Sequence, residues 1–74
     1  MVELQGFIEV TALSDGEKLS IRTDSIDAVY DNPETELSWG KKPRFTTIEY
    51  SGGHSIDVIE NYEEVKHRMW RADL

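Results

Sequence analysis

The chain has 74 residues, of which 38% are hydrophobic and 31% charged, and this composition fits one small globular domain over residues 1–74 rather than a disordered segment. Fifteen acidic and eight basic side chains give a net charge of −7, which argues against a surface built to grip nucleic acid or anionic lipid. The absence of cysteine excludes a disulfide framework, a thiolate nucleophile and a cysteine-based zinc site.

No apolar run approaches the roughly 18 residues of a membrane span, and the chain does not open with a basic-then-apolar leader. We therefore expect a soluble cytoplasmic protein with no membrane partner. In so short a chain, burial of the core only narrowly offsets the entropy of ordering it, and no disulfide or evident metal site adds support. Self-association would bury more apolar area, so we also expect a homo-oligomer.

The N-terminal half opens with a predicted hairpin. Apolar and polar residues alternate over residues 7–12 and again over 18–22, which is the period of a half-buried strand. The Asp-Gly pair at 15–16 favours a two-residue type I′ turn between them. In that register Val10 would lie opposite Ile21, so apolar side chains would meet across the hairpin.

A corner and a short strand follow the first hairpin. Threonine, aspartate and serine dominate residues 23–27, and these residue types favour a tight corner or a single helical turn. Residues 28–30 then predict a short third strand. Asn32 and Pro33 end it, because proline has no backbone donor for a ladder.

A second hairpin is predicted from two further alternating segments, residues 46–50 and 54–58. A two-residue loop between them would mix the two faces. A three-residue loop over 51–53, with Gly53 left-handed, would instead place Ile48 opposite Ile56. We therefore predict the three-residue loop.

The C-terminal segment, residues 61–72, predicts a helix. Asn61 can cap its N-terminus, with Glu64 at the third helical position. One stripe of the helix carries the apolar residues Tyr62, Val65, Met69 and Ala72. The expected fold is α+β: a small, mostly antiparallel sheet of two hairpins and a short strand, covered by one C-terminal helix.

The order of these signals resembles the FlbD-type small proteins associated with bacterial flagella, and similar short uncharacterised bacterial and phage proteins. The resemblance rests on Val10-Thr11 before a turn that ends at Gly16, an I-x-x-D-x-I motif over 21–26, a T-x-I-x-Y-x-x-G pattern near Gly53, and an E-x-Y-x-E-V motif over 60–65. It covers roughly residues 7–69. It implies this fold and a flagellar-associated role, and it brings no catalytic residues with it.

The longest connection, residues 31–45, departs from that pattern and is the most unusual part of the chain. It is predicted to be a long loop or an extended hairpin, and such segments are often functional. Its candidate binding residues are Trp39, Lys41, Lys42, Arg44 and Phe45. Cations beside aromatic rings suit a phosphate with a stacked base, or an acidic groove on a partner protein. In the alternative interpretation, Trp39 covers the edge of the core and the cations stay in solvent.

The acidic residues are unevenly distributed. Residues 1–36 hold nine acids and two bases, whereas residues 37–74 hold six of each. The acidic half could imitate nucleic-acid phosphates and occupy a basic groove on a partner. In the alternative interpretation it is a solvated face that aids solubility.

The last part of the helix supplies a second candidate surface. Trp70 lies about 120° from the centre of the apolar stripe, at 100° per residue, so it should not enter the same core. With His67 and Arg71 it could anchor an interface, including one between copies of the chain. Alternatively, the helix frays or Trp70 packs under the long loop.

Signals for chemistry are weak. The D-x-D-x-D-G calcium loop and the H-E-x-x-H zinc motif are missing from the sequence. Ser55 follows His54 in a predicted strand, so the two side chains should point to opposite faces rather than pair. We expect no enzyme activity, no metal and no cofactor.

The leading hypothesis is a non-enzymatic acidic interaction module or inhibitor that occludes a basic or aromatic surface on a larger protein partner. The resemblance suggests a phage or mobile-element source, and direct DNA binding is not expected. The first alternative is an oligomer that sequesters a nucleotide or other anion, with cations holding phosphate and Trp39 or Trp70 stacking on a base. The second alternative is a flagellar-associated regulator.

Overall fold

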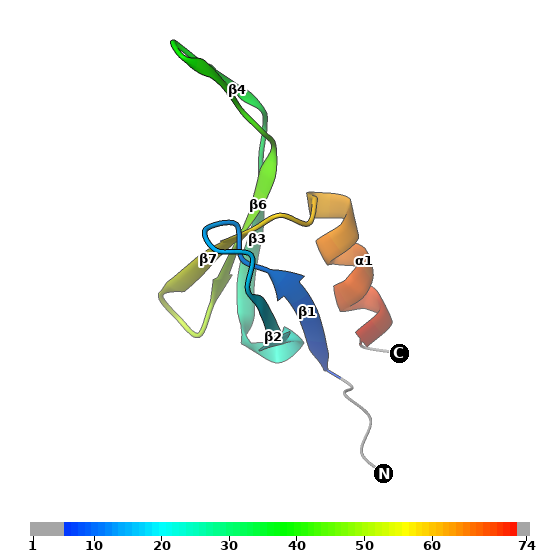
Figure 1. Ribbon diagram of the computed structural model, residues 1–74. Helices are drawn as coiled ribbons and strands as arrows, with labels where there is room; N and C mark the ends of the chain where they lie inside the picture. Colours follow the sequence, from blue (N-terminus) through cyan, green and yellow to red (C-terminus); the bar gives the residue numbers. More distant parts are fainter. Residues whose placement is uncertain (1–5, 73–74) are drawn as a thin grey trace.

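The computed structural model describes residues 6–72, and it confirms an α+β fold of mostly antiparallel strands with one C-terminal helix (Figure 1). In chain order the elements are β1 (Phe7–Thr11), β2 (Lys18–Arg22), the 3-10 turn η1 (Thr23–Ser25), β3 (Ile26–Asn32), β4 (Thr35–Leu37), β5 (Gly40–Lys42), β6 (Phe45–Tyr50), β7 (His54–Val58) and α1 (Tyr62–Ala72). No helix within residues 6–72 is long and apolar enough to span a bilayer.

The strands form a body around a single core. The hairpin β1-β2 and the sheet β3-β6-β7 meet where Ala12 pairs with Val58. Flanking this bridge, the N–H of Leu13 donates to the carbonyl of Asp57 at 2.8 Å. The helix α1 covers the open side beside β1 (Figure 1). The buried core consists of Ile8, Val10, Ile21, Ile48, Val58 and Val65.

The helix begins and ends as predicted. The N–H of Glu64 donates to the side-chain oxygen of Asn61 at 2.7 Å, which is the expected N-cap bond. Val65 is fully buried, and the rest of the predicted stripe is half-buried. Glu63 and Glu64 in the first turn and Arg71 in the last complement the helix dipole.

The register of the first hairpin differs from the prediction. Val10 pairs with Leu19 rather than Ile21, a shift of two residues. The connection is longer than a two-residue turn, since the N–H of Ala12 donates to the carbonyl of Glu17 at 2.8 Å. A type I′ turn needs positive φ at both central residues. Gly16 has φ of 75°, but Asp15 does not have positive φ, so the predicted turn does not form. Because side chains alternate with period two, a shift of two leaves the apolar residues on the core face.

The second hairpin has the predicted register, with Ile48 opposite Ile56 and a loop over residues 51–53. The left-handed residue was placed wrongly. Ser51 and Gly52 have φ of 52° and 70°, whereas Gly53, at 155°, lies outside the left-handed helical range. The N–H of Ser51 donates to the carbonyl of Ser25 at 2.8 Å, which fixes the start of the loop against η1.

The third strand, β3, is longer than the predicted residues 28–30 and pairs along β6 as an edge of the sheet. Its register shifts between Ile26 and Ala28, so Asp27 forms a bulge. The Asp27 carboxylate accepts the N–H of Gly52 at 2.9 Å, which joins the bulge to the β6-β7 loop. Period-two alternation did not predict this bulge, because a polar residue followed by a second apolar run looks like a gap between two separate elements.

Candidate interaction arm

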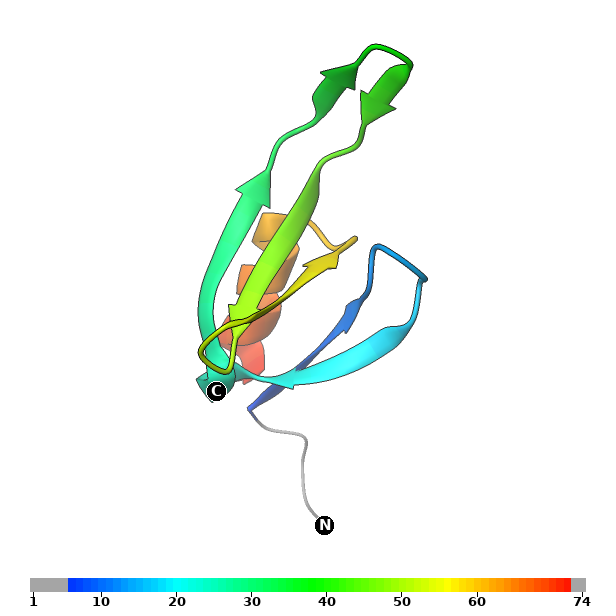
Figure 2. The ribbon, with the colours of Figure 1, turned by 90° about the vertical axis from the view of Figure 1, so that its left-hand side faces the viewer.

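Residues 33–44, here called the arm, continue strands β3 and β6 away from the body (Figures 1 and 2). Asn32 pairs with Phe45, and three residues further along each strand Thr35 pairs with Lys42, so one register runs through the whole ribbon. Pro33 and Pro43 lie in the gap, one on each strand. Because proline has no N–H to donate, the ladder is interrupted there and resumes beyond it. The long connection is therefore an extended hairpin.

The tip of the arm is apolar and uncovered. Leu37 pairs with Gly40, which leaves Ser38 and Trp39 as the turn. Trp39 exposes 82% of its surface, and Leu37 exposes 37%. The interpretation in which Trp39 covers the core edge is wrong, because six residues of extended strand carry the tip about 20 Å from the end of β3, at roughly 3.4 Å per residue.

The two lysines of the arm have intramolecular partners. The ammonium of Lys41 lies 3.8 Å from a carboxylate oxygen of Glu34, and both side chains are more than half exposed. The ammonium of Lys42 lies 4.6 Å from the centre of the Phe45 ring, in a cation–π arrangement. Such exposed contacts are weak, so both lysines can turn to another carboxylate at little cost.

Arg44 braces the root of the arm. Its guanidinium donates two hydrogen bonds to the Asp31 carboxylate, at 2.6 and 2.8 Å, and a longer one to Glu63 at 3.5 Å. These bonds from Arg44 hold the pKa of Asp31 below its usual value, and the bonds to Asp31 raise the pKa of Arg44. The arm is thereby tied both to β3 and to the first turn of α1.

Phe45 is not an exposed binding residue, which corrects the sequence-based expectation. It is 8% exposed and lies at the first position of β6, beneath Lys42. The reason is where the interruption of the β ladder ends. Asn32 and Phe45 are already paired, so Phe45 belongs to the sheet of the body and its ring is buried there. Of the predicted aromatic pair, only Trp39 remains available to a partner.

The predicted helix residues form a separate group. Trp70 is 62% exposed, and its ring lies 6.2 Å from that of His67. Arg71 is exposed one residue further on. The helix continues to Ala72, so it does not fray at Trp70. Trp70 also does not pack under the arm, because α1 starts near the root of the arm and runs away from it (Figure 1).

A surface that the sequence interpretation missed lies beside β7. A hollow of about 290 Å³ is lined by Leu13, Ser14, Ser55, Ile56 and Asp57. Ile59, just beyond β7, is 55% exposed. The adjacent apolar pair Val58-Ile59 was the available signal, because neighbouring strand residues point to opposite faces and only one of them can enter the core.

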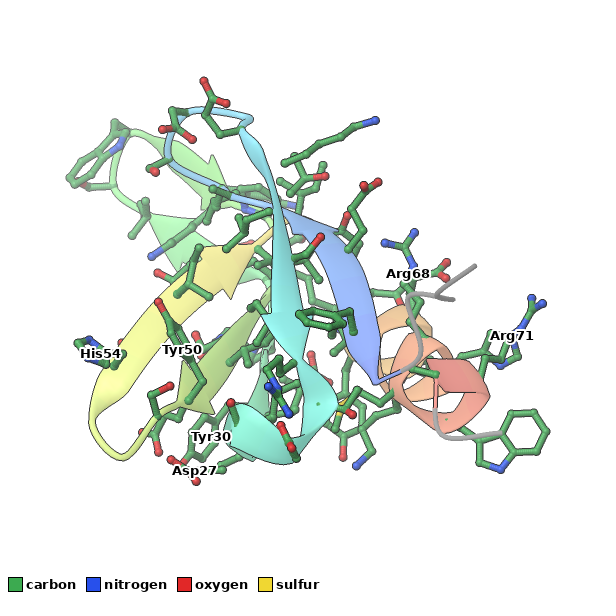
Figure 3. All side chains as sticks on the ribbon, turned by 90° about the horizontal axis from the view of Figure 1, so that it is seen from below. Asp27, Tyr30, Tyr50, His54, Arg68 and Arg71 are labelled. Atoms are coloured by element: carbon green, nitrogen blue, oxygen red, sulfur yellow. The ribbon has the colours of Figure 1, made fainter. Side chains whose placement is uncertain are left out.

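The side chain of His54 belongs to a different surface from the basic residues of the helix. His54 stacks on Tyr50 with ring centres 5.6 Å apart, and these two residues lie on the opposite side of the molecule from Arg68 and Arg71 (Figure 3). Within residues 6–72 no group of three or more histidine, aspartate or glutamate side chains is placed to hold a metal ion. A second hollow, of about 430 Å³, lies between β1 and α1 and is lined by Phe7, Ile8, Glu9, Arg68, Arg71 and Ala72.

Comparison with known proteins finds no matching family model, no matching curated protein and no matching solved structure. The resemblance to FlbD-type proteins remains a prediction from the sequence.

Proposed function

We propose that the chain is a non-enzymatic interaction module that inserts the tip of its arm into a larger protein partner and occludes the surface around that contact. The observation that carries this proposal is Trp39, 82% exposed at the end of a braced hairpin. Tryptophan dominates binding hot spots, since it buries a large apolar area with few rotatable bonds. An exposed tryptophan so far from the core has no role in stabilising the fold.

The bracing at the root supports the same proposal. The bidentate bond between Arg44 and Asp31 orders the arm before a partner arrives. A preordered element loses less conformational entropy on binding, so more of the contact energy appears as affinity. A hairpin held in this way acts as a fixed projection.

Charge indicates the kind of partner surface. The arm holds three bases and two acids, so the rest of the chain carries a net charge of −8. An acidic body around a projecting anchor complements a basic surface that surrounds an apolar pocket. The chain would then act as an inhibitor by covering that basic surface.

The anion-binding alternative has less support from the geometry. Arg44 is held by two carboxylates and Lys41 lies beside a third. A phosphate at the arm would have to displace these acids and would meet the negative field of the body. A thermal-shift screen with nucleotides tests this alternative: stabilisation that disappears in Lys42→Ala would favour it over the interaction module.

The test of the main proposal is affinity capture from the native host with the tagged chain, its Trp39→Ala variant and a Trp70→Ala control. We expect a protein that the original chain and Trp70→Ala both retain and that Trp39→Ala releases. With the purified partner, titration calorimetry should show affinity loss of at least about tenfold for Trp39→Ala, as for a hot-spot residue. The proposal would be overturned if Trp39→Ala captured the same protein as the original chain, or if no protein were captured at all.

A further inference from the structure

The hollow beside β7 and the tip of the arm are two partly apolar surfaces that nothing covers within the described residues. The hollow has a volume of about 290 Å³, near the lower end of the range for ligand pockets, and suits one inserted side chain better than a whole ligand. Its apolar lining comes from Leu13 and from Ile56, whose side chain also packs against the core, and Ser14, Ser55 and Asp57 supply the polar part. The tip presents Trp39 and Leu37 as an uncovered apolar projection.

Register explains why the apolar surface around the hollow faces outward. Ala12 and Val58 pair across the bridge, and both are buried in the core. Their neighbours Leu13 and Ile59 therefore point to the outer face, where they are diagonal partners. Leu13 is 37% exposed and Ile59 55% exposed, so an uncovered apolar patch adjoins the hollow.

Charge favours a second copy of the chain as the occupant. The arm carries a net charge of +1 and the remainder of the chain −8. Asp57 lines the hollow, and Asp15 follows its wall residue Ser14 in the β1-β2 loop. An arm that brings Trp39 into the hollow brings Lys41 close to these acids, and Lys41 gives up only its weak pair with Glu34.

We infer that two copies of this chain associate by arm exchange, each placing Trp39 in the other's hollow beside Leu13 and Asp57. One two-fold axis makes both contacts at once, because a tip-to-hollow contact and its reciprocal are related by that axis. The contact is made by side chains rather than by added strands, since β4 and β5 are only three residues long each. A small core that gains by burying further apolar area fits this arrangement.

This inference rests on the proposed function in treating the arm as the docking element, and it adds regulation. The dimer covers the residue that the larger partner needs, so self-association and partner binding compete for Trp39. In the free protein the apolar tip is covered by a second copy of the chain. A partner that binds the tip more tightly than the second copy does displaces that copy. Partner affinity should therefore fall as the concentration of the chain rises.

Sedimentation equilibrium over micromolar to millimolar concentrations tests the exchange with the purified chain alone. We expect a dimer that Trp39→Ala weakens at least tenfold and that Trp70→Ala leaves unchanged. Circular dichroism and the melting temperature establish that both variants are folded. A chain that stays monomeric at millimolar concentration overturns the inference. A dimer whose dissociation constant is unchanged in Trp39→Ala, or is raised in Trp70→Ala, overturns it as well.

A charge-exchange pair makes the test specific to the contact. One variant carries Lys41→Glu and Lys42→Glu in the arm, and the other carries Asp15→Lys and Asp57→Lys beside the hollow. Each alone should be monomeric, because like charges then meet at both contacts. Mixed together they should form a heterodimer, in which both contacts are restored. No recovery on mixing overturns the inference.

The two proposals can fail separately. Sedimentation needs no partner, so a monomeric chain that still captures a protein through Trp39 leaves the interaction module standing without arm exchange. A dimer that depends on Trp39, with no captured protein, leaves the exchange standing and removes the larger partner.

Discussion

Arg44 and Asp31 form a bidentate ion pair, with nitrogen–oxygen distances of 2.6 and 2.8 Å, at the point where the β ladder stops. Pro33 and Pro43 remove two backbone donors in the adjoining gap. The side-chain pair therefore takes over, across the gap, the role that main-chain hydrogen bonds play on either side of it. We therefore expect the contacts from Arg44 to Asp31 and Glu63 to fix the direction of the arm.

Replacing Arg44 should loosen the arm and leave the body intact. In Arg44→Met the bonds to Asp31 and Glu63 are lost, while the aliphatic stem is kept. Hydrogen exchange of the β4 and β5 amides should accelerate, with the β6 and β7 amides unchanged. Arg22→Met is the matched control, because Arg22 pairs with Asp24, two residues away and far from the arm. Equal exchange in both variants would contradict a bracing role.

The same pair predicts how the arm responds to acid. Hydrogen bonds from Arg44 hold the pKa of Asp31 below its ordinary value of 3.8. A carboxylate whose pKa is lowered by folding contributes order that is complete above the unfolded pKa and is lost as the pH falls through the folded pKa. Protection of the arm amides, taken relative to the intrinsic exchange rate at each pH, should thus stay constant down to about pH 4 and fall below it. Asp31→Asn should abolish this pH step, and a step that survives in Asp31→Asn would exclude Asp31 as its source.

Glu60 joins β1 to the helix. Its carboxylate accepts the N–H and the hydroxyl of Thr11, both at 2.9 Å, and lies 3.4 Å from the guanidinium of Arg68. Its side chain exposes 10% of its surface. Burial raises the pKa of Glu60, but the hydrogen bonds from Thr11 and its own N–H and the charge of Arg68 outweigh it and bring the pKa below the ordinary 4.5.

Glu60→Gln should reduce the free energy of unfolding by about 2 kcal/mol at neutral pH, because glutamine keeps only one acceptor oxygen for the two bonds from Thr11 and loses the charge that faces Arg68. The deficit should shrink as the pH falls below about 4.5, since the native carboxylate is then protonated as well. Urea denaturation from pH 7 to pH 3 measures this difference. Glu64→Gln is the control: its exposed pair with Arg68 should contribute less than about 1 kcal/mol. A deficit that is constant with pH would exclude ionisation of Glu60 as the cause.

Sequence patterns predicted those parts of the fold in which the faces of the strands decide the outcome. In the second hairpin only one loop length puts Ile48 opposite Ile56, so the register was determined. In the first hairpin a shift of two residues preserves the faces, and the pattern could not choose between Ile21 and Leu19 as the partner of Val10. The choice depends on how the loop closes at Ala12 and Glu17, which period-two alternation does not encode.

The candidate site was predictable only in part, for a similar reason. The sequence left open whether Trp39 is exposed or covers the edge of the core, and the outcome depends on the pairing of β4 with β5, which carries Trp39 away from the body. The burial of Phe45 did not follow, because it depends on where pairing resumes after Pro43. The hollow beside Leu13 joins residues 13–14 to residues 55–57, and a contact between such distant segments requires the tertiary fold.

Stability and binding should depend on different apolar residues. Ile48 is fully buried, so Ile48→Ala should cost about 3 kcal/mol through lost burial and the cavity left behind. Trp39→Ala should change the free energy of unfolding by less than about 0.5 kcal/mol, measured under conditions where the chain is monomeric. Urea denaturation of both variants provides the comparison. A large loss in monomeric Trp39→Ala would show that the tip is needed for folding and would weaken its assignment as a binding residue.

In the loop between β6 and β7, the energetic effect of a left-handed backbone can be measured without a change in side-chain contacts. Gly52 has φ of 70°, and a Cβ added there would meet no atom within 4 Å. Gly52→Ala should therefore cost about 1 kcal/mol, from the left-handed backbone alone. Ser51, with φ of 52°, already bears this strain, so in Ser51→Gly its relief should nearly balance the added entropy of the unfolded chain, within about 0.5 kcal/mol. Equal losses in the two variants would point instead to damage of the bonds from this loop to Ser25 and Asp27, which bear on both residues alike.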